Sequence, residues 1–101
     1  MHMIRYTLRP ERVAENEQLV RMIIDQLRDL EPSGMRYAVY RLDDGVTFIH
    51  LISHGAGAGH LPGRKLDALR AFHGGLHERC IEPPIRVELS AIGEYPTVGD
   101  K

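Results

Sequence analysis

Three side chains of this sequence have the chemistry of a site for proton transfer and anion binding. His50 carries an imidazole whose reference pKa of about 6.5 suits a general base near neutral pH. Arg5 and Arg86 lie in two other extended segments and could hold an anion, because a guanidinium stays charged and presents several donors. We expect these three residues to form a candidate catalytic group. The alternative is that His50 only makes interface hydrogen bonds and that Glu88 neutralises Arg86 in an ion pair.

A second group of reactive side chains lies between residues 73 and 80. His73 and His77 are four residues apart, which on a helix is the spacing of two zinc ligands. The intervening glutamate of the zinc-protease motif and any paired cysteines are missing, so we predict no metal site. Cys80 has no resolving cysteine and is expected to be buried. The glycine-rich stretch 55–59 lacks the end of a phosphate-binding loop, and residues 55–64 predict a surface loop.

The whole chain has the size and composition of one ordinary globular domain. Its 101 residues are 43% hydrophobic and 27% charged, and 13 basic against 14 acidic side chains give a formal net charge of -1. Such a chain has no field that gathers phosphates or anionic lipid, so we expect no nucleic-acid or membrane partner. No apolar run approaches the roughly 18 residues of a membrane helix or the roughly 7 of a signal-peptide core. A single cysteine cannot close an intrachain disulfide, and we expect a cytoplasmic protein.

Hydrophobic periodicity predicts four strands and two helices in the order β-α-β-β-α-β. The strands are expected near residues 3–8, 35–42, 46–54 and 85–92, and the helices near 11–31 and 65–82. Gly74-Gly75 could kink or break the second helix, because each glycine costs about 1 kcal/mol relative to alanine in a helix interior. This order is that of the ferredoxin-like α+β fold, in which both helices cover one face of a four-stranded antiparallel sheet.

Asp44-Gly45 predicts a hairpin between the second and third strands. With a two-residue loop, Tyr40 faces Ile49 and Val39 faces His50, whereas a three-residue loop would shift the pairing by one. One face of the hairpin is nearly all apolar and carries Ala38, Tyr40, Leu42, Ile49 and Leu51. The other face is mixed and carries Tyr37, Val39, Arg41, Phe48, His50 and Ile52.

The mixed face, extended by Arg5, Thr7 and Arg86, is the one that we expect the helices to leave uncovered. An uncovered face with apolar side chains marks an interface or a binding site. Two such faces turned toward each other would form a homodimer that encloses a cavity. On this interpretation Phe48→Asp should weaken the dimer by burying an unpaired charge.

The chain resembles the antibiotic-biosynthesis-monooxygenase-like (ABM-like) group of dimeric α/β-barrel proteins, and in particular its small uncharacterised bacterial members. The resemblance covers roughly residues 3–95. It rests on the element order, the helix lengths, the hairpin Arg41-Leu-Asp-Asp-Gly-Val-Thr-Phe48 and the segment Glu78-Arg-Cys-Ile-Glu-Pro-Pro84. It implies one dimeric domain over residues 1–95, with residues 96–101 as a flexible tail.

The resemblance also implies two kinds of chemistry. A heme-degrading branch uses an asparagine on the first strand, a tryptophan on the third and a histidine on the second helix. This chain has no tryptophan, and its only asparagine, Asn16, lies in the first predicted helix. Other members are cofactor-free oxygenases of phenolic or quinol compounds. Such a reaction needs a base, a cation and a cavity that excludes water, and His50 with Arg5 or Arg86 could supply the first two.

We therefore expect a homodimer that binds a small aromatic or quinol compound and needs no cofactor. The residues expected to line the ligand are Tyr37, Phe48, Ile52 and His73. Cofactor-independent oxygenation is the reaction that this arrangement suggests. The alternative is a non-catalytic dimer that binds a small molecule or has a structural role, and the missing tryptophan and strand asparagine favour it.

Overall fold

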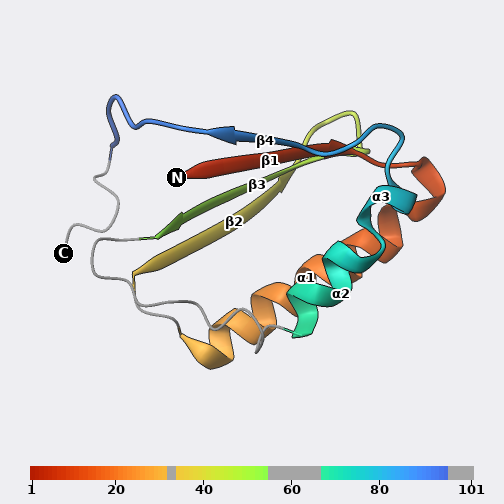
Figure 1. Ribbon diagram of the computed structural model, residues 1–101, viewed down its shortest axis with the longest axis horizontal. Helices are drawn as coiled ribbons and strands as arrows, with labels where there is room; N and C mark the ends of the chain where they lie inside the picture. Colours follow the sequence, from red (N-terminus) through yellow and green to blue (C-terminus); the bar gives the residue numbers. More distant parts are fainter. Residues whose placement is uncertain (32–33, 55–66, 96–101) are drawn as a thin grey trace.

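The computed structural model of the protein describes residues 1–31, 34–54 and 67–95. Four antiparallel strands form one sheet, and the helices lie on one side of it (Figure 1). The strands are β1 (His2–Thr7), β2 (Met35–Arg41), β3 (Thr47–His54) and β4 (Ile85–Glu88). Their order across the sheet is β2-β3-β1-β4. The α+β, ferredoxin-like fold expected from the sequence is confirmed.

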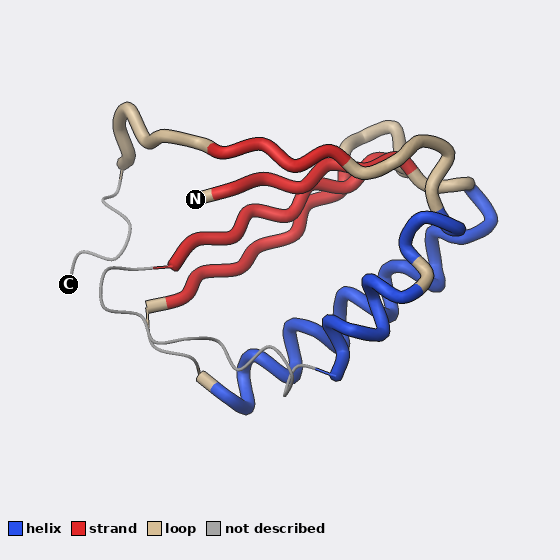
Figure 2. The backbone as a smooth tube through the Cα atoms, viewed as in Figure 1, coloured by secondary structure: helices blue, strands red, loops and turns tan. Residues whose placement is uncertain are grey.

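The helical segments are η1 (Pro10–Arg12), α1 (Val13–Leu30), α2 (Asp67–Gly74) and α3 (Leu76–Arg79) (Figure 2). Helix α1 ends where Glu31 takes a left-handed conformation with φ 47° and its N–H donates to the carbonyl of Leu27. The second predicted helix is broken between Gly74 and Leu76, because glycine stabilises the helical conformation poorly. The predicted loop 55–64 and the tail 96–101 lie outside the described residues. None of the helices in the described ranges combines the length and apolarity needed to cross a membrane.

The β2-β3 hairpin has the register expected from the sequence. Tyr40 pairs with Ile49 and Val39 pairs with His50. Asp44 stabilises the turn, because its Oδ1 accepts from the backbone N–H groups of Val46 and Thr47 at 2.9 and 2.8 Å. Gly45 supplies the turn's left-handed residue, with φ 80°.

The register divides the sheet into two faces that run across the strands. Rows on the helix-covered face are Arg41-Phe48-Tyr6, Val39-His50-Ile4-Arg86 and Tyr37-Ile52-His2-Glu88. Rows on the opposite face are Tyr40-Ile49-Arg5-Ile85 and Ala38-Leu51-Met3-Val87. We call this second face the outer face. It is largely aliphatic, and Tyr40 and Ile85 are more than half exposed on it.

The expectation that the mixed face stays uncovered is wrong. Tyr6, Phe48 and His50 are buried beneath the helices, and the apolar face is the outer one. Two effects explain the reversal. Aromatic rings bury more surface than aliphatic side chains, and the polar atoms of this face bind one another, so that burying them leaves no unmet hydrogen bond.

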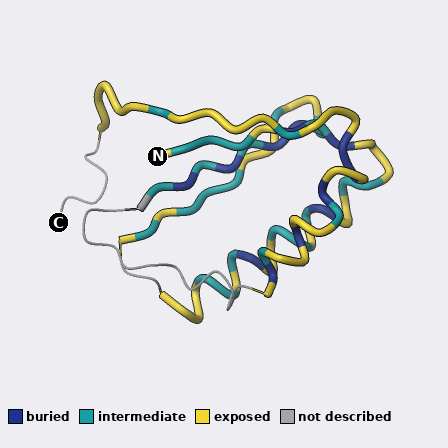
Figure 3. The backbone as a smooth tube through the Cα atoms, in the orientation of Figure 1, coloured by how far each residue is buried: buried dark blue, intermediate teal, exposed yellow. Residues whose placement is uncertain are grey.

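The core lies where β1 and β3 meet α1 and α2, and the buried segments gather there (Figure 3). The Tyr6 ring stacks on Phe48 with centroids 5.7 Å apart, and the ring centroid of Phe72 in α2 lies 5.8 Å from that of Tyr6. Cys80 is buried at the end of this cluster, as the sequence predicted, and burial raises the pKa of its thiol.

Candidate functional site

His50 lies in β3 on the helix-covered face and is fully buried. Both ring nitrogens contact tyrosine hydroxyls: Nε2 lies 2.7 Å from Oη of Tyr6, and Nδ1 lies 3.0 Å from Oη of Tyr37. The ring of Phe72 covers the imidazole, with centroids 5.0 Å apart. The two tyrosines therefore occupy both positions at which His50 could exchange a proton with a ligand.

The hydrogen bonds continue from Tyr6 to two further buried side chains. Nδ2 of Asn16 donates to Oη of Tyr6 at 3.0 Å, and Nε of Arg79 donates to Oδ1 of Asn16 at 3.1 Å. Asn16 and Arg79 are both almost completely buried. We call the series Arg79, Asn16, Tyr6, His50 and Tyr37 the buried chain. Every buried side-chain nitrogen and oxygen of the described residues has a hydrogen-bond partner.

The protonation states of the buried chain follow from its burial. Loss of hydration disfavours charge, so burial lowers the pKa of His50 to about 4, with a smaller effect from His73. Burial raises the pKa of Tyr37 to about 12 and that of Tyr6 well above its usual range. At neutral pH the imidazole is therefore neutral and both tyrosines carry their hydrogens.

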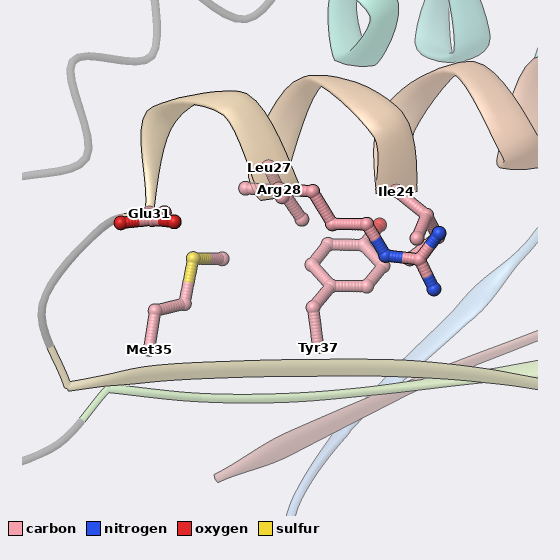
Figure 4. Close-up of a pocket in the computed structure, with 6 residues that line it drawn as sticks. All are labelled: Ile24, Leu27, Arg28, Glu31, Met35 and Tyr37. Carbon is pink, nitrogen blue, oxygen red and sulfur yellow. The ribbon is translucent and has the colours of Figure 1, made fainter.

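A pocket of about 310 Å³ opens beside Tyr37, between the C-terminal turns of α1 and the start of β2 (Figure 4). Its lining residues are Ile24, Leu27, Arg28, Glu31, Met35 and Tyr37. The ring of Tyr37 rises from β2 toward α1 with the Arg28 side chain beside it, while Glu31 lies at the other end above Met35. We call this the Tyr37 pocket. Its volume is at the lower end of the range for small-molecule sites, roughly 300 Å³ upward.

The sequence matches no protein-family model and no curated protein at a significant level. Solved structures do match. Rv0793 from Mycobacterium tuberculosis is 20% identical with a TM-score of 0.61, covering 93% of this chain and 95% of its own. A candidate antibiotic biosynthesis monooxygenase from Caulobacter crescentus is 16% identical with a TM-score of 0.65, covering 91% of this chain and 88% of its own.

A second candidate antibiotic biosynthesis monooxygenase, from Bordetella bronchiseptica, is 15% identical with a TM-score of 0.57. The alignment covers 90% of this chain and 95% of that protein. The chain has an ABM-like fold. Identities of 15 to 20% establish the fold alone, so the site has to be argued from its own residues.

Within this ABM-like fold, the predicted catalytic group does not come together as expected. Arg5 pairs with Ile49 and lies on the outer face, on the opposite side of the sheet from His50. The expectation that they share a face is wrong, because neighbouring residues of a strand point to opposite faces. Arg86 does share the row of His50, but Ile4 lies between them and Arg86 is exposed. Its Nη2 lies 3.1 Å from Oε2 of Glu88, which is the ion pair of the alternative interpretation.

The four predicted ligand-lining residues separate into three environments. Tyr37 lines the Tyr37 pocket, while Phe48 and Ile52 are buried and Phe48 also lines a separate pocket of about 260 Å³. His73 lines a second pocket of about 280 Å³ on the other side of the domain. Its other lining residues are Ile4, Leu76, His77, Pro84, Ile85 and Arg86. Within the described ranges, no three His, Cys, Asp or Glu side chains lie close enough together to hold a metal ion.

Sequence reasoning missed Asn16 and Arg79 as members of the site. Asn16 falls on the apolar stripe of α1, three residues after Val13 and four before Val20. A polar residue on such a stripe is a usable signal, because burial forces it to find a partner. Arg79 occupies the equivalent place three residues after Leu76. No local sequence pattern predicts that these two side chains bind each other.

Proposed function

We propose that this protein binds a small aromatic or quinol compound in the Tyr37 pocket, with an oxygen of the ligand hydrogen-bonded to the hydroxyl of Tyr37. The observation that carries the proposal is the 3.0 Å contact between Tyr37 Oη and His50 Nδ1, made by a tyrosine that lines this pocket. Ile24, Leu27 and Met35 supply the apolar surface against which an aromatic ring would pack.

The geometry supports a preorganised site. His50 is held by Tyr6 on its other side, so the hydroxyl of Tyr37 has a fixed position before any ligand arrives. A polar group that needs no reordering loses less entropy when it binds. One fixed hydroxyl beside the apolar side chains of Ile24, Leu27 and Met35 should therefore orient a ligand that has a single polar end.

The Tyr37→Phe variant tests this proposal with two probes, 1-naphthol and 1-methylnaphthalene, which have similar shapes and differ in the hydroxyl. Wild-type protein should bind 1-naphthol roughly threefold to tenfold more tightly, the usual net value of one hydrogen bond. In Tyr37→Phe the two probes should bind equally. Dissociation constants from NMR titration measure the difference.

Tyr40→Phe is the matched control, because Tyr40 lies in the same strand, three residues along, on the outer face. It should keep the wild-type preference for 1-naphthol. Equal binding of the two probes by wild-type protein, or an undiminished preference in Tyr37→Phe, would contradict the proposed hydrogen bond.

Cofactor-independent oxygenation of the bound phenol or quinol is a second candidate function. It is supported by the protonated Tyr37 hydroxyl and the nearby Arg28, because a hydrogen-bond donor and a cation both favour a phenolate over a phenol. In such a reaction the phenolate supplies all the electrons: one oxygen atom of O₂ becomes a new carbonyl and the other leaves as water. His50, enclosed by Tyr6, Tyr37 and Phe72, then positions Tyr37 instead of acting as the base.

Oxygen uptake with a panel of hydroquinones and naphthols, in metal-free buffer, tests this second function. The oxygenase candidate predicts uptake by wild-type and Tyr40→Phe protein that falls by more than tenfold in Tyr37→Phe, since a preorganised donor to a developing anion is worth about that or more. Equal uptake by wild-type protein and buffer would leave ligand binding as the function.

We also propose that the working form is a homodimer in which a second copy covers the outer face. Tyr40, Ile85 and Val87 are large hydrophobic side chains that remain exposed there. Val87 continues the apolar row of Ala38, Leu51 and Met3, while Arg5 lies between Ile49 and Ile85 in the neighbouring row. A patch of this kind marks an interface, and sheets pack well face to face.

A further inference from the structure

We propose that Arg79 is a positioning residue that sets the direction of every hydrogen bond in the buried chain, and so makes Tyr37 a hydrogen-bond donor toward the ligand. The inference rests on the proposed ligand site and narrows its ligand class. Tyr37 would select a compound whose oxygen accepts a hydrogen bond, such as an aromatic ketone, a quinone or a phenolate.

Arg79 must be the donor in the first hydrogen bond of the buried chain, because its guanidinium has only donors. Nη2 donates to the carbonyl of Phe72 at 2.7 Å, and the guanidinium carbon lies 5.2 Å from the centre of the Phe72 ring. These contacts hold the side chain so that Nε points to Asn16 at 3.1 Å. Among the described residues, no carboxylate forms a salt bridge with this buried cation.

The orientation of the Asn16 amide fixes the next hydrogen bond, which is the one to Tyr6. The amide atom that faces Nε of Arg79 has to be the oxygen, since a donor needs an acceptor. The NH₂ group of Asn16 then faces Tyr6, and it donates to Oη at 3.0 Å. The only other hydrogen-bond partner of that hydroxyl among the described residues is Nε2 of His50, at 2.7 Å. The hydrogen of Tyr6 therefore points to His50.

His50 completes the series at Tyr37. A neutral imidazole carries one hydrogen, and Nε2 already accepts from Tyr6, so the hydrogen sits on Nδ1. Nδ1 donates to Oη of Tyr37 at 3.0 Å. The hydrogen of Tyr37 itself has no partner in the buried chain, and Tyr37 lines the Tyr37 pocket. A hydroxyl that accepts one hydrogen bond becomes a better donor of the next.

The Asn16→Asp variant tests the direction, because a carboxylate has the same shape as the amide and can only accept. The carboxylate would accept from Arg79 and also from the hydroxyl of Tyr6, which would then take its second bond from His50. The hydrogen of His50 would move to Nε2, and Tyr37 would donate to Nδ1 and offer only an acceptor to the pocket. The new carboxylate is paired with Arg79, so it leaves no uncompensated buried charge.

The experiment has two readouts, the first of which needs no ligand. The ¹⁵N chemical shifts of the His50 ring distinguish the nitrogen that carries hydrogen from the one that does not. Wild-type protein should carry it on Nδ1 and Asn16→Asp on Nε2. The matched control is Gln18→Glu, the same amide-to-carboxylate change at an exposed position of α1, which should behave as wild type. Arg79→Met should populate both tautomers, because Asn16 would be free to turn.

The second readout is the ligand preference, measured with 1-tetralone, which can only accept, and 1-naphthol, which can also donate. In Asn16→Asp the affinity for 1-tetralone should fall roughly threefold to tenfold while that for 1-naphthol is kept. A hydrogen on Nε2 in wild-type protein, or on Nδ1 in Asn16→Asp, would overturn the proposal. If the tautomers behave as expected and neither probe binds wild-type protein, the ligand site is refuted and the directional chain stands.

Discussion

Phe48→Asp is expected to prevent folding, while the same change at the adjacent Ile49 should leave a folded protein. Phe48 is 3% exposed and stacks in parallel on Tyr6. An unpaired carboxylate there would cost several kcal/mol, a large part of the roughly 5 to 15 kcal/mol that stabilises a typical domain. Far-ultraviolet circular dichroism of both variants measures the difference.

Ile49→Asp is the matched control, since the two positions differ by one residue and face opposite sides of the sheet. If a second copy covers the outer face, this variant should sediment at micromolar concentration as an 11 kDa monomer, whereas wild-type protein sediments as a dimer. A folded, monomeric Phe48→Asp would restore the assignment of faces that the sequence suggested. A dimeric Ile49→Asp would contradict the proposed interface.

Acid should destabilise this protein through His50. The pKa of His50 is about 4 in the folded protein, below the roughly 6.5 of an unfolded histidine, so the unfolded state binds a proton first as the pH falls. Neutral His50 makes its full contribution to the free energy of unfolding above about pH 6.5. This contribution decreases below that pH and is lost as the pH falls through 4. The free energy of unfolding should fall by about 3 kcal/mol over this range, measured by urea denaturation.

His50→Gln isolates this effect, because glutamine does not titrate while an amide can still bind hydroxyls. The pH dependence should be flatter in this variant than in wild-type protein. His77→Gln, at an exposed histidine of α3, should keep the wild-type slope. A wild-type slope in His50→Gln would show that other groups, such as the carboxylate of Asp44, cause the acid sensitivity.

The sequence was sufficient for the order of elements and for the hairpin register, because both depend on local patterns. Asp44-Gly45 places the turn, and strand residues alternate from it in both directions. Local sequence patterns do not determine which face of the sheet the helices cover. That choice depended on contacts with distant residues, such as Phe72 of α2, whose ring centroid lies 5.0 Å from that of His50.

The candidate site was partly predictable for the same reason. Tyr37 and His50 come from adjacent strands, and their proximity follows from the hairpin. Asn16 and Arg79 are 63 residues apart, and their contact needs α1 and α3 to meet beneath β1. The expectation that Arg5 shares a face with His50 was wrong, because His50 pairs with Ile4 and Arg5 pairs with Ile49. The side chain of Arg5 therefore lies on the opposite face of the sheet.

The crystal structure of the complex with 1-naphthol is the strictest test of the proposed ligand site. The ring should lie among Ile24, Leu27 and Met35, with its oxygen within about 3.2 Å of Oη of Tyr37, a hydrogen-bond distance. A ring bound in the pocket beside His73 and Arg86, or bound beside Tyr37 with its oxygen turned to solvent, would contradict the proposed site.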